Sequence, residues 1–203
     1  MKACRRTRLA TLLLASVAGI MPCVPSSALR ADSEYSSRSG KISFNVGSNV
    51  PFLKVSGSSS RIKGGGEATV NGNSVMVNNL QFEVDPKTFK TGIELRDQHL
   101  YERVFTASDG SVPAIVLKAE HFQAAPNGKP GTWEGNLKGQ LSMRGVTKPV
   151  SFRARLEKNG NGAVVMAEGT IKTSSFGVKE ITYSGATVND EVNITVSNLR
   201  VEP

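Results

Sequence analysis

The chain has 203 residues, with 25 lysines and arginines against 17 acidic residues and a formal net charge of +8. This length allows one domain that buries a substantial core. The basic excess does not indicate a nucleic-acid-binding surface, because the basic residues are not clustered but mostly alternate with apolar ones, as at Arg153 and Arg155.

The first 28 residues have the pattern of a secretory signal peptide. Basic residues within the first eight positions precede an apolar stretch over 9–20, which is short for a membrane span. Small residues favour cleavage after Ala28, which would give a periplasmic or secreted protein. Cys23 leaves an acylated lipoprotein open, but Pro22 fits poorly in the position before an acylated cysteine.

Cleavage after Ala28 would remove both cysteines of the chain, Cys4 and Cys23. It would also remove four basic residues, which leaves 21 lysines and arginines against 17 acidic residues and a net charge near +4. No disulfide could then form, so the fold would depend on its core alone. We expect residues 29–39, which are polar and serine-rich, to be a flexible N-terminal segment, and residues 40–203 to form one barrel domain.

Alternation of apolar and polar residues then predicts strands through most of the chain. Glycines at 64–66 are expected to break one early strand, and residues 71–73 (NGN) predict a tight turn. The apolar residues of 75–77 and 80–84 alternate in different phases, which predicts a bulge at 78–79. The apolar positions of the two earliest strands are Ile42, Phe44, Val46, Leu53 and Val55.

Residues 86–105 differ from the rest because their spacing is helical. Pro86 can begin a short helical turn, and Leu95, His99 and Arg103 are four residues apart. We therefore expect one or two short helices that cross between strands.

The later strands include a long one over 133–143, with Gly135 and Gly139 on its inward face. Such glycines make room inside a sheet or let it bend, and Gly139 is expected to leave space that a leucine could fill. The pattern predicts an all-β fold, an eight-stranded antiparallel lipocalin-like barrel with a short helical crossover. A barrel of this size can hold one small ligand, although small inward residues also fit a flattened sandwich.

Four segments together carry a family resemblance. Residues 141–150 (LSMRGVTKPV) form a predicted hairpin, and residues 91–100 read TGIELRDQHL. With SFGV at 175–178 and VNDEVNI at 188–194, these segments resemble signatures of the YceI-like lipid- and polyisoprenoid-binding family. An aromatic residue and a tyrosine that the family usually has after Leu100 are missing. The resemblance implies a periplasmic lipocalin-like barrel that holds a long isoprenoid or another amphiphile.

The residues expected to contact this ligand are apolar and mostly on inward strand faces. They are Leu80, Phe82, Val84, Phe105, Ile115, Leu117, Leu137, Leu141, Met143, Phe152 and Phe176.

Three polar residues, Arg96, Asp97 and His99, allow more than one interpretation. Arg96 and Asp97 could pair and tie the helical segment to the barrel end, or the three could contact a ligand headgroup. Catalysis by His99 with a carboxylate is the weaker alternative, because the chain has no Gly-x-Ser-x-Gly elbow and its other histidine, His121, lies in a different segment. The spacing of His99 and His121 does not indicate a metal site.

The predicted function is non-catalytic binding, sequestration or transport of a long-chain isoprenoid or other amphiphilic lipid in the periplasm. No cofactor is expected, although a bound isoprenoid quinone or polyprenyl lipid would suit the interior. The alternatives are an envelope stress or interaction protein with a closed barrel and, less favoured, a small envelope enzyme. Transient membrane contact and a homodimer are left open.

Overall fold

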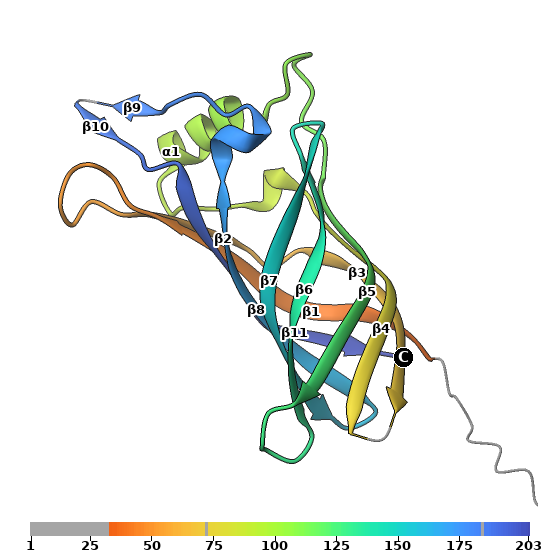
Figure 1. Ribbon diagram of the computed structural model, residues 1–203. Helices are drawn as coiled ribbons and strands as arrows, with labels where there is room; N and C mark the ends of the chain where they lie inside the picture. Colours follow the sequence, from red (N-terminus) through yellow and green to blue (C-terminus); the bar gives the residue numbers. More distant parts are fainter. Residues whose placement is uncertain (1–32, 72, 184) are drawn as a thin grey trace, which may run out of the picture.

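The computed structural model describes residues 33–71, 73–183 and 185–203. The predicted signal peptide over 1–28 lies outside these residues. Eight long antiparallel strands wrap around a common interior, and a short helical segment lies over one end (Figure 1). The barrel strands and their companion β2 are β1 (Ser33–Val46), β2 (Val55–Ser59), β3 (Ile62–Asn71), β4 (Ser74–Val84), β5 (Ile115–Pro126), β6 (Thr132–Met143), β7 (Val146–Asn159), β8 (Gly162–Lys172) and β11 (Glu191–Glu202).

The barrel closes because its first and last strands pair. Lys41 to Asn45 of β1 lie opposite Ser197 to Asn193 of β11. On its other edge, β1 pairs with β3 near the start of the strand and with β2 near its end, so β2 and β3 together occupy one place in the barrel wall. The predicted eight-stranded antiparallel barrel is therefore confirmed.

The two ends of the barrel differ. One end, here called the loop end, carries the long connections over 47–54, 85–114 and 173–190. The other end, here called the turn end, carries the short connections after β3, β5 and β7. In Figure 1 the loop end lies at the top, where α1 (Glu94–His99) and the small hairpin of β9 (Thr182–Tyr183) and β10 (Ala186–Thr187) are labelled.

The expectation of a flexible segment over 29–39 was wrong for residues 33–39. These residues form the first half of β1, where Ser33 to Ser36 pair with Ala68 to Gly65 of β3. Ser36 and Ser37 also pair with the end of β11. Polar composition did not prevent strand formation here, because both neighbouring strands supply backbone partners.

The glycines at 64–66 were expected to break an early strand. This expectation was wrong, because all three lie inside β3. A Cβ on Gly65 would collide with the backbone carbonyl of Tyr35 on β1, so this position needs a residue without a side chain. The bulge predicted at 78–79 is confirmed, because three residues of β3 (Gly65 to Glu67) lie opposite four of β4 (Asn78 to Gln81). Asn79 there has a φ of 51°.

The helical crossover predicted over 86–105 is also confirmed. It consists of a 3-10 turn, η1 (Pro86–Thr88), the helix α1 and a π-helical continuation, η2 (Leu100–Phe105). Asp85 caps the first turn by accepting a hydrogen bond from the backbone N–H of Lys87 at 2.9 Å.

The hairpin predicted at 141–156 is formed by β6 and β7. Met143 pairs with Val146, and the two residues between them, Arg144 and Gly145, have φ values of 55° and 77°. Positive φ at both central positions is the geometry of a type I′ turn, which matches the twist of paired strands. Its inward residues are buried or half-buried, as the alternation predicted.

Gly139 does not border open space, contrary to the expectation. A Cβ on this residue would lie 2.5 Å from the backbone oxygen of Lys118 on β5 and 3.3 Å from the Ala119 side chain. The glycine therefore lets the paired strands β5 and β6 approach each other closely, and a leucine there would collide with β5 instead of filling a space.

Candidate functional site

The interior of the barrel is hollow. A cavity of about 1290 Å³ extends from the turn end to the loop end and contacts every barrel strand. Pockets for drug-sized ligands commonly measure about 300–1,000 Å³. This cavity therefore suits a larger or longer molecule, and it differs from the filled interior that a closed interaction barrel would need.

The wall of the cavity is apolar along its length. The structure places ten of the eleven predicted contact residues in the lining, and they come from β4, β5, β6, β7 and the end of the helical crossover. These ten are Leu80, Phe82, Val84, Phe105, Ile115, Leu117, Leu137, Leu141, Met143 and Phe152.

Phe176 is the exception. It belongs to the 3-10 turn η3 (Thr173–Phe176) and is only 2% exposed, but it does not line the cavity. Its ring is packed in the hydrophobic core, so the structure does not bring Phe176 together with the other predicted contact residues.

Sequence reasoning missed part of the lining. Phe44 and Phe89 line the cavity below the helical crossover, where the Phe89 ring centroid lies 5.9 Å from that of Phe44 and 5.6 Å from that of Phe105. The alternation of β1 could have identified Phe44. Phe89 follows a 3-10 turn and has no periodic neighbours, so no local pattern marks it. The lining residues from β8 and β11 were also missed: Val165, Ala167, Ile171, Val192, Ile194, Val196, Leu199 and Val201.

Two aromatic residues lie at the turn end of the cavity. Trp133 donates a hydrogen bond from Nε1 to the backbone oxygen of Asn73 at 2.7 Å. The Tyr35 hydroxyl donates to the backbone oxygen of Asn161 at 3.4 Å. These bonds tie the aromatic side chains to the turns on either side of this end.

Polar side chains gather around the cavity at the loop end. Arg96 and His99 are both half-buried and both line it. Within the described part of the chain, the Arg96 guanidinium has no hydrogen-bond or ion-pair partner. A cation in this position can approach an anionic or strongly polar group that enters the tube.

Asp97 anchors the helical crossover, but not through Arg96 as the sequence suggested. Its Oδ1 accepts hydrogen bonds from the backbone N–H of Thr91 at 2.7 Å and from the Thr91 hydroxyl at 2.6 Å. Its Oδ2 lies 3.6 Å from Nζ of Lys90. Arg96 and Asp97 are adjacent in the helix and point differently, so the carboxylate reaches back to the residues before α1.

The electrostatics of Asp97 follow from these contacts. Burial acts to raise the pKa of this carboxyl, whose side chain is only 14% exposed. The hydrogen bonds from Thr91 and the charge of Lys90 outweigh burial, and the pKa is lowered below its ordinary value. Asp97 is therefore an ionised carboxylate that holds the segment before α1 in place, and it does not line the cavity.

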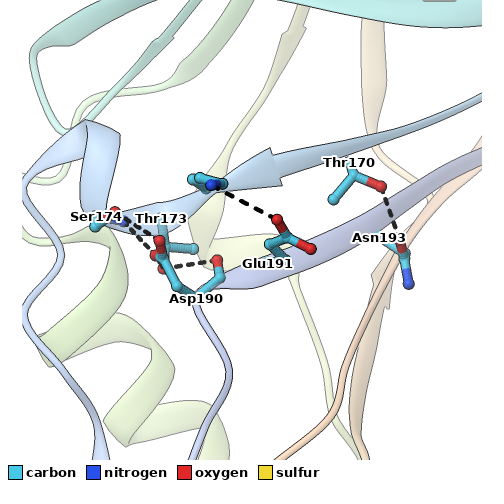
Figure 2. Close-up of polar contacts among 7 residues, drawn as sticks. Thr170, Thr173, Ser174, Asp190, Glu191 and Asn193 are labelled. Atoms are coloured by element: carbon cyan, nitrogen blue, oxygen red, sulfur yellow. Dashed lines mark hydrogen bonds and ion pairs between the residues drawn. The ribbon is translucent and has the colours of Figure 1, made fainter.

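A second carboxylate, Asp190, holds the other side of the loop end (Figure 2). Its Oδ2 accepts from the Ser174 hydroxyl at 2.6 Å, and its Oδ1 accepts from the Ser174 backbone N–H at 2.7 Å and the Thr173 hydroxyl at 2.9 Å. The Ser174 hydroxyl is the main reason why the pKa of Asp190 is lowered. Asp190 thus fixes the turn η3 to the start of β11.

Arg144 links these two parts of the loop end. From the tip of the β6–β7 hairpin, its Nη1 donates to the backbone oxygen of Gly177 at 3.1 Å and to that of Arg103 at 3.4 Å. One side chain therefore connects the hairpin, the helical crossover and the turn η3.

The two histidines lie in different environments. His99 faces the cavity, whereas His121 is exposed on β5, where its Nδ1 lies 2.9 Å from Oδ1 of Asn78. Among the described residues, no group of three or more histidine, cysteine or acidic side chains is arranged to hold a metal ion. Nor does the described part contain a helix that is both long and apolar enough to cross a membrane.

Comparison with known proteins identifies the domain. The family model of the YceI-like domain matches residues 34–198. None of the curated proteins shows a detectable match to this chain.

Solved structures with the same barrel include BcnA of Burkholderia cenocepacia, with a TM-score of 0.58 and 18% identity over 81% of this chain and 96% of that one. A polyisoprenoid-binding domain of Saccharophagus degradans, implicated in plant cell wall breakdown, has a TM-score of 0.57 and 12% identity over 83% and 97%. A Campylobacter jejuni YceI protein has a TM-score of 0.54 and 17% identity over 75% and 86%. At these identities the likeness shows the fold.

Proposed function

Because the chain belongs to the YceI-like family, we propose that it binds a long-chain isoprenoid or another amphiphilic lipid inside its barrel and carries it without a chemical step. The observation that carries this proposal is the cavity of about 1290 Å³, which has an apolar wall and polar residues at the loop end. Sequestering a chain there is favourable by about 0.8 kcal/mol per buried CH₂ group.

The distribution of polar side chains sets the orientation of the ligand. The apolar chain lies between the walls of β4 to β8, and the headgroup lies at the loop end near Arg96 and His99. A polar headgroup in the middle of the tube would lose its hydrogen bonds with water and find no partner, which is costly. An isoprenoid quinone and a polyprenyl phosphate both fit this arrangement.

The family and one of its solved structures support the choice of ligand class. The Saccharophagus degradans neighbour is described as a polyisoprenoid-binding domain. The signal-peptide pattern of residues 1–28 supports export, so we place this binding in the periplasm or outside the cell.

The test uses two adjacent residues of β8 that face opposite sides of the wall. Ala167 lines the cavity and lies opposite Ala154 and Val196, so this level of the tube is lined by small side chains. Glu168 is exposed on the outer face. Ala167→Phe should block the tube, and Glu168→Phe should leave it open.

Native mass spectrometry and organic extraction of the purified full chain measure the result. We expect the wild type and Glu168→Phe to carry a co-purifying lipid with a long apolar chain, and Ala167→Phe to carry little or none while remaining folded. A wild type without lipid, which also fails to take up polyprenyl phosphate or isoprenoid quinone in vitro, would contradict the proposal.

A further inference from the structure

The loop between β1 and β2 places a large apolar side chain in water. Phe52 is 100% exposed, and its neighbours Val50 and Leu53 are 41% and 42% exposed. The loop projects from the loop end of the barrel, beside the β9–β10 hairpin (Figure 1). An isolated exposed aromatic residue is common enough, but this one belongs to a larger group.

Two exposed apolar residues of the helical crossover belong to the same end. Ile93 and Leu95 are 50% and 54% exposed, and both line the cavity, as Leu53 does. The five exposed apolar side chains thus lie in two segments of the loop end, and three of them line the apolar tube. We call Val50, Phe52, Leu53, Ile93 and Leu95 the apolar rim.

The backbone shows that Phe52 is held outward by a built turn. The backbone N–H of Leu53 donates to the oxygen of Val50 at 3.2 Å, which closes a turn with Pro51 and Phe52 at its centre. Phe52 has a φ of 66°, a conformation that this position of a type II turn reserves for glycine or asparagine. A bulky residue there is strained and, being fully exposed, gains no packing in return.

Hydrogen bonds fix the rest of the loop. The Ser48 hydroxyl lies 3.1 Å from the backbone oxygens of both Val50 and Leu53, which share its single proton. The loop is tied to β10 by Asn49, whose Oδ1 accepts from the N–H of Thr187 at 2.7 Å. The Phe52 ring is thus presented on an anchored support.

The charge of the residues around the β1–β2 loop indicates which kind of surface the apolar rim would bind. From residue 46 to residue 66 the chain contains Lys54, Arg61 and Lys63 and no acidic residue. All three are exposed, and none forms an ion pair with a described residue. The acidic residues of the neighbouring segments include Glu94, between Ile93 and Leu95 in the chain, and Glu83, which lies opposite Lys63 on β4. Apolar side chains flanked by unpaired cations match a bilayer surface with anionic headgroups.

We propose that the apolar rim docks the barrel on an anionic lipid bilayer, with Phe52 inserted among the headgroups and the opening of the tube facing the membrane. The inference rests on the proposed function, because an apolar cargo can then pass between bilayer and tube without crossing water. Docking itself needs only the rim and its cations.

Vesicle flotation tests the docking. Liposomes of phosphatidylcholine with or without phosphatidylglycerol are mixed with the full chain and with Val50→Ser/Phe52→Ser, which changes two rim residues that do not line the cavity. The control is Val70→Ser/Met76→Ser, which removes two exposed apolar residues from the β3–β4 hairpin at the turn end. We expect the wild type and the control to float with the anionic vesicles, and the rim variant to lose at least tenfold in binding. Added salt should weaken wild-type binding.

Tryptophan fluorescence gives a second measurement. The chain has a single tryptophan, Trp133, which lies at the turn end. Phe52→Trp should show a blue shift on addition of anionic vesicles, and the wild type, which reports only Trp133, should not.

The outcomes separate docking from cargo binding. A rim variant that keeps its co-purified lipid but no longer floats supports docking. A wild type that carries lipid but does not float, or a control that loses binding equally, overturns docking and leaves the proposed function intact. The rim could instead be buried between two copies of the chain. A wild type with twice the monomer mass in solution, and a rim variant with the monomer mass, would show such a dimer and would also overturn membrane docking. A wild type that floats without cargo would support docking and count against the proposed function.

Discussion

The barrel wall and the loop end are held together by different kinds of interaction. In the wall, each long strand pairs with neighbours on both sides, with register shifts in several pairs, and apolar side chains face a common interior. At the loop end, a few side chains make the connections, chiefly Asp97, Asp190 and Arg144. A container needs both, because a wall that opened would lose its ligand and an end that never opened could not take one up. Local opening is expected where stability depends on few contacts.

The largest effect is expected in the wall, at Gly139. Gly139→Ala should lower the free energy of unfolding by about 3 kcal/mol, because the new Cβ would lie 2.5 Å from the oxygen of Lys118 in a strand that cannot move away freely. Gly47→Ala is the matched control. Its Cβ would meet only the Asn189 side-chain amide at 3.1 Å, which can rotate away, so stability should change little. Urea unfolding of both variants measures the difference. Equal stability of the two variants would show that β5 and β6 can move apart enough to accept the added methyl group.

The next effect is expected at the loop end. Asp97→Asn should lower the free energy of unfolding by about 2 kcal/mol, because the charged acceptor of the two Thr91 hydrogen bonds is lost. Lipid retention should be unchanged in the folded fraction, since Asp97 does not line the cavity.

Asp109→Asn serves as the control for this variant. Asp109 accepts hydrogen bonds only within its own exposed turn, from Ser111, and should contribute little to global stability. If Asp97→Asn lost its lipid at unchanged stability, Asp97 would contact the headgroup and would not be an anchor.

A smaller effect is expected from pH. The pKa values of Asp97 and Asp190 are lowered in the folded protein, so their contribution to stability is present above the ordinary aspartate pKa of about 3.9. It is lost as the pH falls through the lowered folded values, because protonation then removes the charged acceptors. We expect the melting temperature to fall with the pH below about 4. The double variant Asp97→Asn/Asp190→Asn should be less sensitive in this range, and an unchanged profile would contradict the assignment.

The smallest effect on stability is expected at Arg96. Arg96→Gln should change the free energy of unfolding by less than about 0.5 kcal/mol, because the guanidinium has no partner among the described residues. It should instead change ligand preference, so that polyprenyl phosphate binds more weakly while an isoprenoid quinone binds about as before. Competition between the two lipids in a native mass spectrometry assay measures this. Equal loss of both, or of neither, would place the headgroup elsewhere.

The sequence alone determined the architecture. Period-two alternation, the hairpin at 141–156, the phase change at 78–79 and the helical spacing of 86–105 all reappear in the structure. These features depend on short-range rules, namely side-chain alternation in strands, turn conformations and helix periodicity, which a single segment carries by itself. Nine of the ten predicted contact residues that line the cavity do so for the same reason, since they lie on strands and the inward face of a strand follows from its alternation.

Only the tertiary structure determined which residues contact one another. Asp97 could not be assigned to Thr91 and Lys90 rather than to Arg96 without the path of the chain before α1. Gly139 could not be assigned to the close passage of β5, nor residues 33–39 to a strand, without knowing which neighbours lie across from them. The same holds for Phe176, which is buried, and for the apolar rim, which joins segments 40 or more residues apart. Alternation specifies which way a side chain points, but contacts across a closed barrel depend on register, coiling and loop placement, which are properties of the whole chain.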